Sequence, residues 1–448
     1  SNKDATINSV SVGKGANSVA TNTVLGYQAL DAAVTGGNNV AIGRVALTSN
    51  TSGATNVAVG DSALYANTTG GSNIGIGYQA LDANTSGNNS VAVGTYSLSA
   101  ASTGGGNTAV GTYALNANTT ASNNTGVGNS ALLNNTTGTN NVALGANAGD
   151  AITTGSYNTA LGKGSLSTST TASNNTAVGE SSLNQTTAGN NTAVGYHALI
   201  ACTTGNANTA VGSQALDANT TGVSLVAVGY GALGANTTAN QNVAVGQNAL
   251  GSNTTGTVNV AVGHDALVTN DTGSYNTAIG ALALDANTTA SNATAVGYGA
   301  LGSNTTGALN TAVGTAALDA NTTGGSNSAL GVNALGQCTT ASDNSAFGTA
   351  ALSNSTTGAS NTAVGSGALR DNSTASNNTA VGTGALLVNT TGSSNTAVGS
   401  GALDACTTGA TNSAFGASAL GANTTGEHNT AIGRWALVLN TTANYNTA

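Results

Sequence analysis

The sequence predicts an all-β protein that folds as a parallel β-solenoid, or β-roll, of about 25 coils with 17 residues in each coil. Three observations predict this class. A glycine closes an Asn-Thr-Ala-Val-Gly word at a nearly constant interval, the residues on either side of the alanine are β-branched or apolar, and the 448 residues contain no proline. Residues two apart share one face of a strand, and proline would remove a hydrogen-bond donor from a sheet.

The interval between these glycines is held along the chain. Between Gly26 and Gly433 there are 24 intervals, of which 23 span 17 residues and one, Gly179 to Gly195, spans 16. A flexible linker rich in Gly, Ser, Thr and Asn would have no reason to hold such a phase. The repeat therefore predicts an ordered structure in which each 17-residue segment is one coil.

The first interval, from Gly13 to Gly26, is only 13 residues long. We therefore divide the chain into short-repeat N-terminal coils at residues 1–26 and a uniform 17-residue-repeat solenoid at residues 27–448. We expect the second part to be a single elongated domain and a segment of a longer chain.

We number the repeat from its glycine, G-x-x-A-L-x-x-N-T-T-G-x-x-N-T-A-V, as positions 1 to 17. Gly, Asn and Thr in every copy disfavour a helix, whereas positions 15 and 17 suit one face of a short strand. In a solenoid each position forms a row of like residues that stack from coil to coil. The structural rows are represented by Gly43, Gly60 and Gly77 at position 1, Leu30, Leu47, Leu64 and Leu81 at position 5, Asn67 and Asn84 at position 8, Ala58 and Ala92 at position 16, and Val59 and Val93 at position 17.

Position 16 is restricted to Ala or Gly, although it points away from the face that carries positions 15 and 17. A face in contact with water would be expected to carry Thr, Ser, Lys or Glu. The restriction therefore indicates close packing, either against a second chain or because both strand faces lie inside one narrow coil. Each coil holds few large apolar side chains, which favours burial between several chains.

Several of the strand words resemble a known family. They are NSVSVG (8–13), NVAIG (39–43), NSVAVG (89–94) and the opening GKGANSVATNTVLG (13–26). They are similar to the head repeats, or β-roll, of trimeric autotransporter adhesins and to repetitive phage and bacterial tail-fibre proteins. The resemblance implies a left-handed parallel β-roll, three chains around one axis, and an extracellular, cell-surface or virion location. This chain departs from the family in its longer repeat, which contains an additional ANTTG-like turn.

The asparagines of position 8 are expected to bond amide to amide along the stack. Cys202, Cys338 and Cys406 replace this asparagine at intervals of eight and four coils, which is too far for a disulfide within one chain. We predict buried free thiols; in the alternative, equivalent cysteines meet at a trimer axis. The Asn-Thr-Thr words also read as glycosylation sequons, but the repeat already explains them.

Other polar residues predict no chemistry. Single aspartates at position 6, as in Asp285 and Asp319, supply too few oxygen ligands for calcium and indicate solvated turns. The three histidines lie in different coils, and a repeated coil offers rows of like groups, whereas catalysis needs unlike groups held together. We therefore expect no enzyme activity, no cofactor and no metal. Tyrosines beside the glycine, such as Tyr298, could touch sugars but are interpreted as decoration of turns.

Charge excludes further classes. Only six Lys and Arg residues are present, and the net charge is −9, which excludes nucleic-acid binding. No apolar run is long enough to insert into a membrane. The sequence predicts a structural or adhesive extracellular fibre, a shaft or head that presents an uncharged polar surface. Its expected partner is itself, as a homotrimer or homopolymer, and a receptor at a cell surface or in the extracellular matrix is a second candidate.

Two alternatives remain at this point. A self-assembling extracellular filament or sheath subunit would use the unpaired edges at the ends of a solenoid. An ice-binding solenoid would use threonine, which recurs at positions 9, 10 and 15. Adjacent positions 9 and 10 point apart, and position 15 then stands alone, so the regular threonine pairs of an ice-binding face are not predicted.

Overall fold

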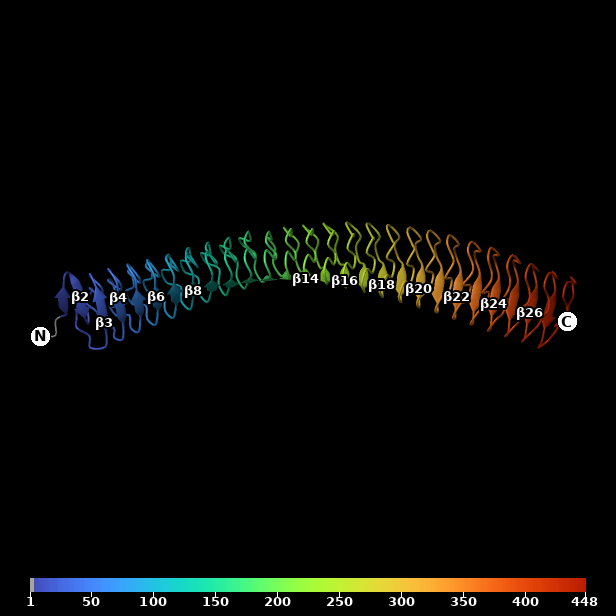
Figure 1. The fold of residues 1–448 in the computed structure, drawn as a ribbon, viewed down its shortest axis with the longest axis horizontal. Helices are drawn as coiled ribbons and strands as arrows, with labels where there is room; N and C mark the ends of the chain where they lie inside the picture. The colour runs from blue at the N-terminus through green and yellow to red at the C-terminus, as the bar shows by residue number, and fades with distance from the viewer. Residues whose placement is uncertain (1–3) are drawn as a thin grey trace. The chain divides into compact units, whose positions relative to one another are not determined.

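The computed structural model describes residues 4–448 and divides into two compact units, unit 1 at Ser1–Ser224 and unit 2 at Leu225–Ala448. Within the described residues every named element is a strand, and no helix there has the length and hydropathy to cross a bilayer. Figure 1 shows the strands of each unit in single file, with one arrow in each coil. The predicted all-β parallel solenoid with 17 residues per coil is confirmed.

Unit 1 contains the strands β1 (Ala5–Ile7), β2 (Val10–Gly13), β3 (Thr23–Gly26), β4 (Val40–Ile42), β5 (Val57–Val59), β6 (Ile74–Ile76), β7 (Val91–Val93), β8 (Thr108–Val110), β9 (Thr125–Val127), β10 (Val142–Leu144), β11 (Thr159–Leu161), β12 (Thr176–Val178), β13 (Thr192–Val194) and β14 (Thr209–Val211). From β3 onward the strands of this unit pair in parallel, each with the next. The register pairs residues at the same position of the repeat, as where Ala41 pairs with Ala58 and Ile42 with Val59.

Unit 2 contains β15 (Val226–Val228), β16 (Val243–Val245), β17 (Val260–Val262), β18 (Thr277–Ile279), β19 (Thr294–Val296), β20 (Thr311–Val313), β21 (Ser328–Leu330), β22 (Ser345–Phe347), β23 (Thr362–Val364), β24 (Thr379–Val381), β25 (Thr396–Val398), β26 (Ser413–Phe415) and β27 (Thr430–Ile432). All of its strand pairs are parallel and keep the 17-residue register.

The start of unit 1 differs from the coils that follow. β1 pairs antiparallel with β2, and β2 pairs antiparallel with β3, before the parallel stack begins. The Asp4 carboxylate accepts hydrogen bonds from the backbone N–H groups of Lys14 and Gly15, at 2.6 and 2.7 Å. This antiparallel segment covers the first edge of the parallel stack, which would otherwise present unpaired backbone groups.

In nearly every coil the interior contains the alanine of position 16 and the leucine of position 5, as in Ala58 and Leu64, which are both fully buried. A Cβ built on Gly75, which replaces this alanine in β6, would lie 3.3 Å from Cγ of Leu64. The position-16 side chain therefore packs on the leucine of its own chain. Contact with a second chain, which the small residues at position 16 favoured, is wrong for this row.

The orientation of positions 15 and 17 could not be read from the repeat. Val59 and Val93, which were assigned to the structural rows, lie on the outer face of the sheet and are half-buried. Alternation requires one strand face to point inward, and from β4 to β27 the inward position, packed against the leucine of position 5, holds only alanine or glycine. The larger β-branched residues consequently face outward.

The position-1 glycines are required by the close approach of successive coils. Gly60 has φ +137°, and a Cβ on it would lie 2.4 Å from the carbonyl oxygen of Gly77 in the next coil. Only glycine satisfies both the backbone angle and this contact. The buried leucines of position 5 are also left-handed, as Leu64 with φ +51°, and the burial of their side chains offsets that strain.

We predict that Gly60→Ala lowers the stability of its coil by about 2–4 kcal/mol, because the new methyl group meets a backbone carbonyl. Hydrogen exchange followed by mass spectrometry measures this locally in a repeat array. Gly384→Ala is the matched control, since Gly384 has φ +65° and nothing lies within 4 Å of its Cβ position. It should cost about 1 kcal/mol or less. Equal protection in the two variants would contradict the prediction.

Candidate functional site

Within each unit the outward side chains of positions 15 and 17 form a continuous surface, which we call the strand face. Every strand from β4 to β27 ends on Val, Ile, Leu or Phe, and these side chains are half-buried or exposed. Leu144 and Leu330 are 49% and 48% exposed, and Phe347 is 40% exposed. An apolar row that continues along a stack of coils is far longer than the scattered apolar residues of an ordinary surface.

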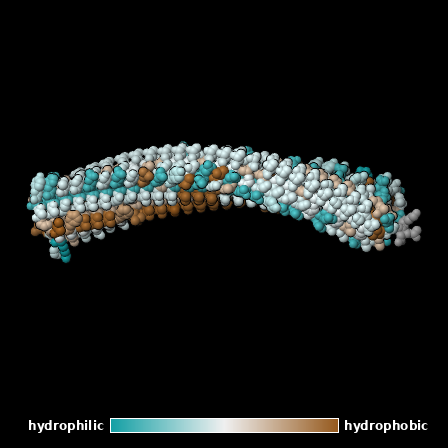
Figure 2. Space-filling view, turned by 180° about the vertical axis from the view of Figure 1, so that it is seen from behind, coloured by the Kyte–Doolittle hydropathy of each residue, from teal (hydrophilic) through white to brown (hydrophobic). Residues whose placement is uncertain are grey.

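Position 15 varies along the strand face. At the start of unit 2 it is Val226, Val243 and Val260, and further along it becomes Thr or Ser. In Figure 2 a brown band of apolar residues follows one face of the C-terminal unit. From β18 onward, where position 15 is Thr or Ser, the residues at position 17 remain apolar.

Inside the coil, the asparagines of position 8 form the predicted amide ladder. Nδ2 of Asn67 donates to Oδ1 of Asn50 at 3.0 Å, and Nδ2 of Asn84 donates to Oδ1 of Asn67 at 2.8 Å. Nδ2 of Asn67 also donates to the carbonyl of Gly70 in its own turn, at 3.0 Å. The side chains are buried, so the bonds of the ladder satisfy amides that would otherwise be costly to bury.

A second buried amide row lies at position 14, which the sequence reasoning did not single out. Oδ1 of Asn39 accepts the backbone N–H of Asn56 at 3.0 Å, and Nδ2 of Asn56 donates to the carbonyl of Gly70 at 2.9 Å. The same pattern repeats through most coils. The signal was present as the asparagine that begins the strand word in all but a few coils, the exceptions being Ser90, Leu225 and Ala293, but the letter alone does not say whether the amide is buried.

The three cysteines interrupt the position-8 ladder. All three are buried and free, and each thiol donates to the position-11 carbonyl that asparagine uses elsewhere, as from Cys338 to Ala341 at 3.7 Å. The predicted buried free thiols are confirmed. A thiol gives the preceding coil no amide donor, and among the described residues Oδ1 of Asn321 and of Asn389, directly before Cys338 and Cys406, has no hydrogen-bond partner.

Burial also controls the chemistry of these thiols. It raises the pKa of Cys338 and of Cys406 to about 11 in each case. Burial likewise raises the pKa of Cys202, and hydrogen bonding that involves Thr186 and the Gly205 backbone opposes this in part. The thiols therefore remain protonated near neutral pH.

The sequon asparagines are position-8 residues, so their Nδ2 atoms lie inside the coil and are hydrogen-bonded, as shown for Asn67 and Asn84. They are not accessible in the folded chain. The position-6 aspartates were expected to be solvated. Asp31 is exposed, but Asp82, Asp217 and Asp404 are half-buried, and desolvation raises the pKa of these three.

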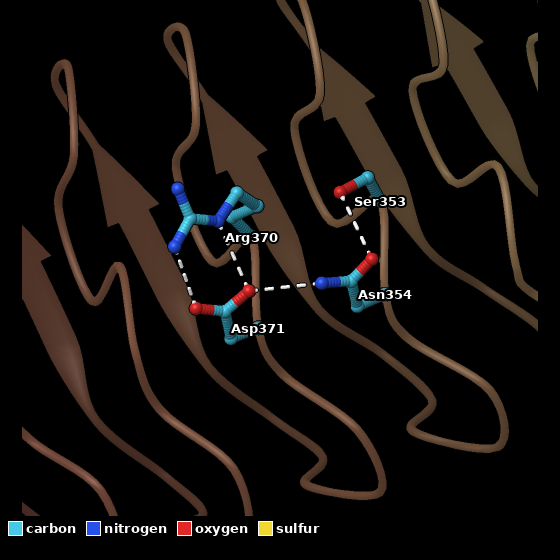
Figure 3. A network of polar contacts seen from close by, with 4 residues as sticks. All are labelled: Ser353, Asn354, Arg370 and Asp371. Atoms are coloured by element: carbon cyan, nitrogen blue, oxygen red, sulfur yellow. Dashed lines mark hydrogen bonds and ion pairs between the residues drawn. The ribbon is translucent and has the colours of Figure 1, made fainter.

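Charged groups on the turns pair locally. Arg370 donates to Asp371 through Nε at 3.0 Å and Nη2 at 2.8 Å, and Asn354 donates to the same carboxylate at 2.9 Å (Figure 3). Hydrogen bonding to Arg370 lowers the pKa of Asp371. Tyrosines on the turns also contact each other, since Tyr96 and Tyr113 stack with ring centroids 5.3 Å apart. Across residues 4–448, no three His, Cys, Asp or Glu side chains form a group that could hold a metal ion.

Together these features define a parallel β-solenoid with buried amide ladders and an apolar outer strand face. No family model matches the sequence, and no curated protein matches it. The resemblance to adhesin head repeats therefore stays a prediction, as do the left hand and the trimer.

We predict that Ellman's reagent leaves the three thiols of the native chain unlabelled and labels all three after denaturation. At about pH 8 a thiol with a pKa near 11 is on the order of one part in a thousand thiolate, and each sulfur is covered. Rapid labelling of the native chain would show that the coils open at these positions.

We also predict that Cys338→Asn stabilises its coil by about 1 kcal/mol. The new amide would reach Oδ1 of Asn321 and Oγ of Ser355, two buried atoms on either side that have no partner among the described residues. Hydrogen exchange of the surrounding segment measures the gain. Cys202→Asn is the control, because Thr186 at the preceding position carries no amide oxygen and already bonds within its own turn. A larger gain at Cys202 would contradict the prediction.

Proposed function

We propose that this chain is a structural segment of an extracellular fibre, of the adhesin or tail-fibre kind, in which identical chains associate along their strand faces. The observation that carries the proposal is the apolar row of position 17 that runs along the outside of the sheet in each unit. A chain that worked alone in water would have no physical reason to hold this row apolar.

The contact would be repetitive. At about 4.8 Å per coil, the thirteen strands of unit 2 extend over roughly 60 Å. A second copy with the same spacing can match the row coil by coil, and the few charges of the chain impose little repulsion. Three chains around one axis would bury one strand face each and leave none exposed, which supports a homotrimer over an open filament. Such a fibre spans distance and belongs at a cell surface or on a virion.

Ice binding receives some support from the orientation of the strand, because Thr at position 15 and Val at position 17 project outward together in regular rows. However, position 17 also accepts Leu330, Phe347 and Phe415. Side chains of such unequal size break the flat lattice that ice requires but suit a packed protein interface. A thermal-hysteresis assay separates the two functions.

We predict that native mass spectrometry and sedimentation of the full chain show a species of three copies. Placing two carboxylates on the strand face, with Val262→Glu and Val296→Glu, should weaken association at least about a hundredfold, because each charge would be buried without a partner. The matched control is Thr255→Glu with Thr289→Glu, which puts the same charge on exposed sites of the same two coils. A monomeric native chain, or equal weakening by both pairs, would contradict the proposal.

A further inference from the structure

A groove runs along the turns of unit 2, on the segment of positions 2 to 7 and away from the strand. Its first hollow, of about 460 Å³, is lined by Asp285, Tyr298, Gly302 and Asp319. Its second hollow, of about 320 Å³, shares Asp319 and continues past Gly336. The two hollows exist because glycine occupies position 6 in alternate coils, between coils that carry a longer side chain.

Two carboxylates converge on the first hollow. A Cβ placed on Gly302 would lie 2.7 Å from Oδ1 of Asp319 and 3.4 Å from Oδ1 of Asp285, so both side chains lean over the same glycine from the coils on either side. No donor among residues 4–448 makes a hydrogen bond to the Asp319 carboxylate. The Asp285 carboxylate accepts only nearby backbone N–H groups, and burial followed by the charges of Asp319 and Asp265 raises its pKa.

An aromatic side chain completes the first hollow. Tyr298 is 59% exposed, and its ring contacts no other aromatic ring in the described part of the chain, unlike Tyr96 and Tyr113. The residue that follows it is Gly299, which leaves space beside the ring. The second hollow shares the Asp319 carboxylate, and the rest of its lining is uncharged and amide-rich, with Asn333, Gln337 and Asn354.

We propose that this groove binds a linear, uncharged oligosaccharide. A pyranose ring presents an apolar face that can stack on Tyr298 and hydroxyl groups that can donate to the two carboxylates. Hydroxyl donors satisfy both carboxylates without a counter-charge, and amides of the second hollow can donate and accept with the following sugars. The two hollows are two coils apart, about 9.6 Å, which is close to the length of a disaccharide unit.

The inference goes beyond the proposed fibre and does not depend on it, because the groove lies on the turns and one chain supplies all of it. If the chain proves monomeric, the groove is unaffected. If the groove binds no sugar, the strand face retains its own argument.

The variant Gly302→Asn is designed to fill the first hollow from within. Other coils show the outcome: Asn116, at the same position, donates through Nδ2 to the carbonyl of Tyr96 at 3.0 Å and to Oγ of Ser99 at 2.7 Å. Asn184 makes the same pair of bonds. An asparagine at residue 302 would thus reach the carbonyl of Leu282 and the Asp285 carboxylate, in a geometry that the fold already accommodates.

The experiment titrates the full chain with cellohexaose, maltohexaose and chitohexaose, using saturation-transfer NMR and calorimetry. At least one of them should bind with a dissociation constant in the millimolar range or tighter. Binding should be lost in Gly302→Asn and about tenfold weaker in Tyr298→Ala. The controls are Gly421→Asn, at the same repeat position beside a single aspartate, and Tyr230→Ala, another exposed tyrosine of unit 2. Both should bind as the unaltered chain does.

Three outcomes would overturn the proposal. The first is no binding of any of the three hexasaccharides. The second is undiminished binding in Gly302→Asn, or equal losses in Gly302→Asn and Gly421→Asn. The third is binding of calcium or spermine at the groove without binding of sugars, which would make the converging carboxylates a cation site.

Discussion

The whole structure depends on the closeness with which one coil lies on the next at position 1. The carbonyl oxygen of a position-1 glycine lies too close to the glycine of the coil before it for that glycine to carry a Cβ. For example, a Cβ on Gly60 would lie 2.4 Å from the carbonyl oxygen of Gly77. A side chain there would separate the coils and break the ladder of backbone hydrogen bonds along the stack. Once this contact sets the register, leucine must lie on leucine and asparagine on asparagine. The regularity of the rows is therefore a consequence of one steric constraint repeated in every coil.

The sequence was sufficient to predict the coils because a strict period leaves few alternatives. It was not sufficient to orient the strand. Alternation shows that Val57 and Val59 share a face opposite Ala58, but not which face is inside. The usual expectation that larger apolar residues are buried fails here. Leu64 already fills the interior of the coil, so the inward-facing residue of the strand that packs against it must have a small side chain. A single turn residue, distant from the strand in the repeat, decides the orientation of the strand.

The polar interior explains which irregularities the stack tolerates. Position 8 can change to Cys338 because sulfur still donates to the carbonyl of Ala341, and the cost is confined to the neighbouring coils, where Oδ1 of Asn321 and Oγ of Ser355 have no partner among the described residues. The groove on the turns was also only partly predictable. The spacing of Asp285, Gly302 and Asp319 is visible in the sequence, but two carboxylates leaning over one glycine become apparent only when neighbouring coils are superposed by the fold.

The repeat also contains an internal comparison that bears on function. Positions 2 and 3 lie on exposed turns and vary freely, from Arg44 to Tyr78 and from Asp265 to Gly299. Position 17 is exposed to a similar extent in many coils, yet it never becomes polar or glycine. Stacking within one chain does not require this, because the side chains point away from the interior. The restriction is explained if the row is covered in the working form of the protein. The copies of the repeat vary on the surfaces that water contacts and stay apolar on the one surface that we propose meets another chain.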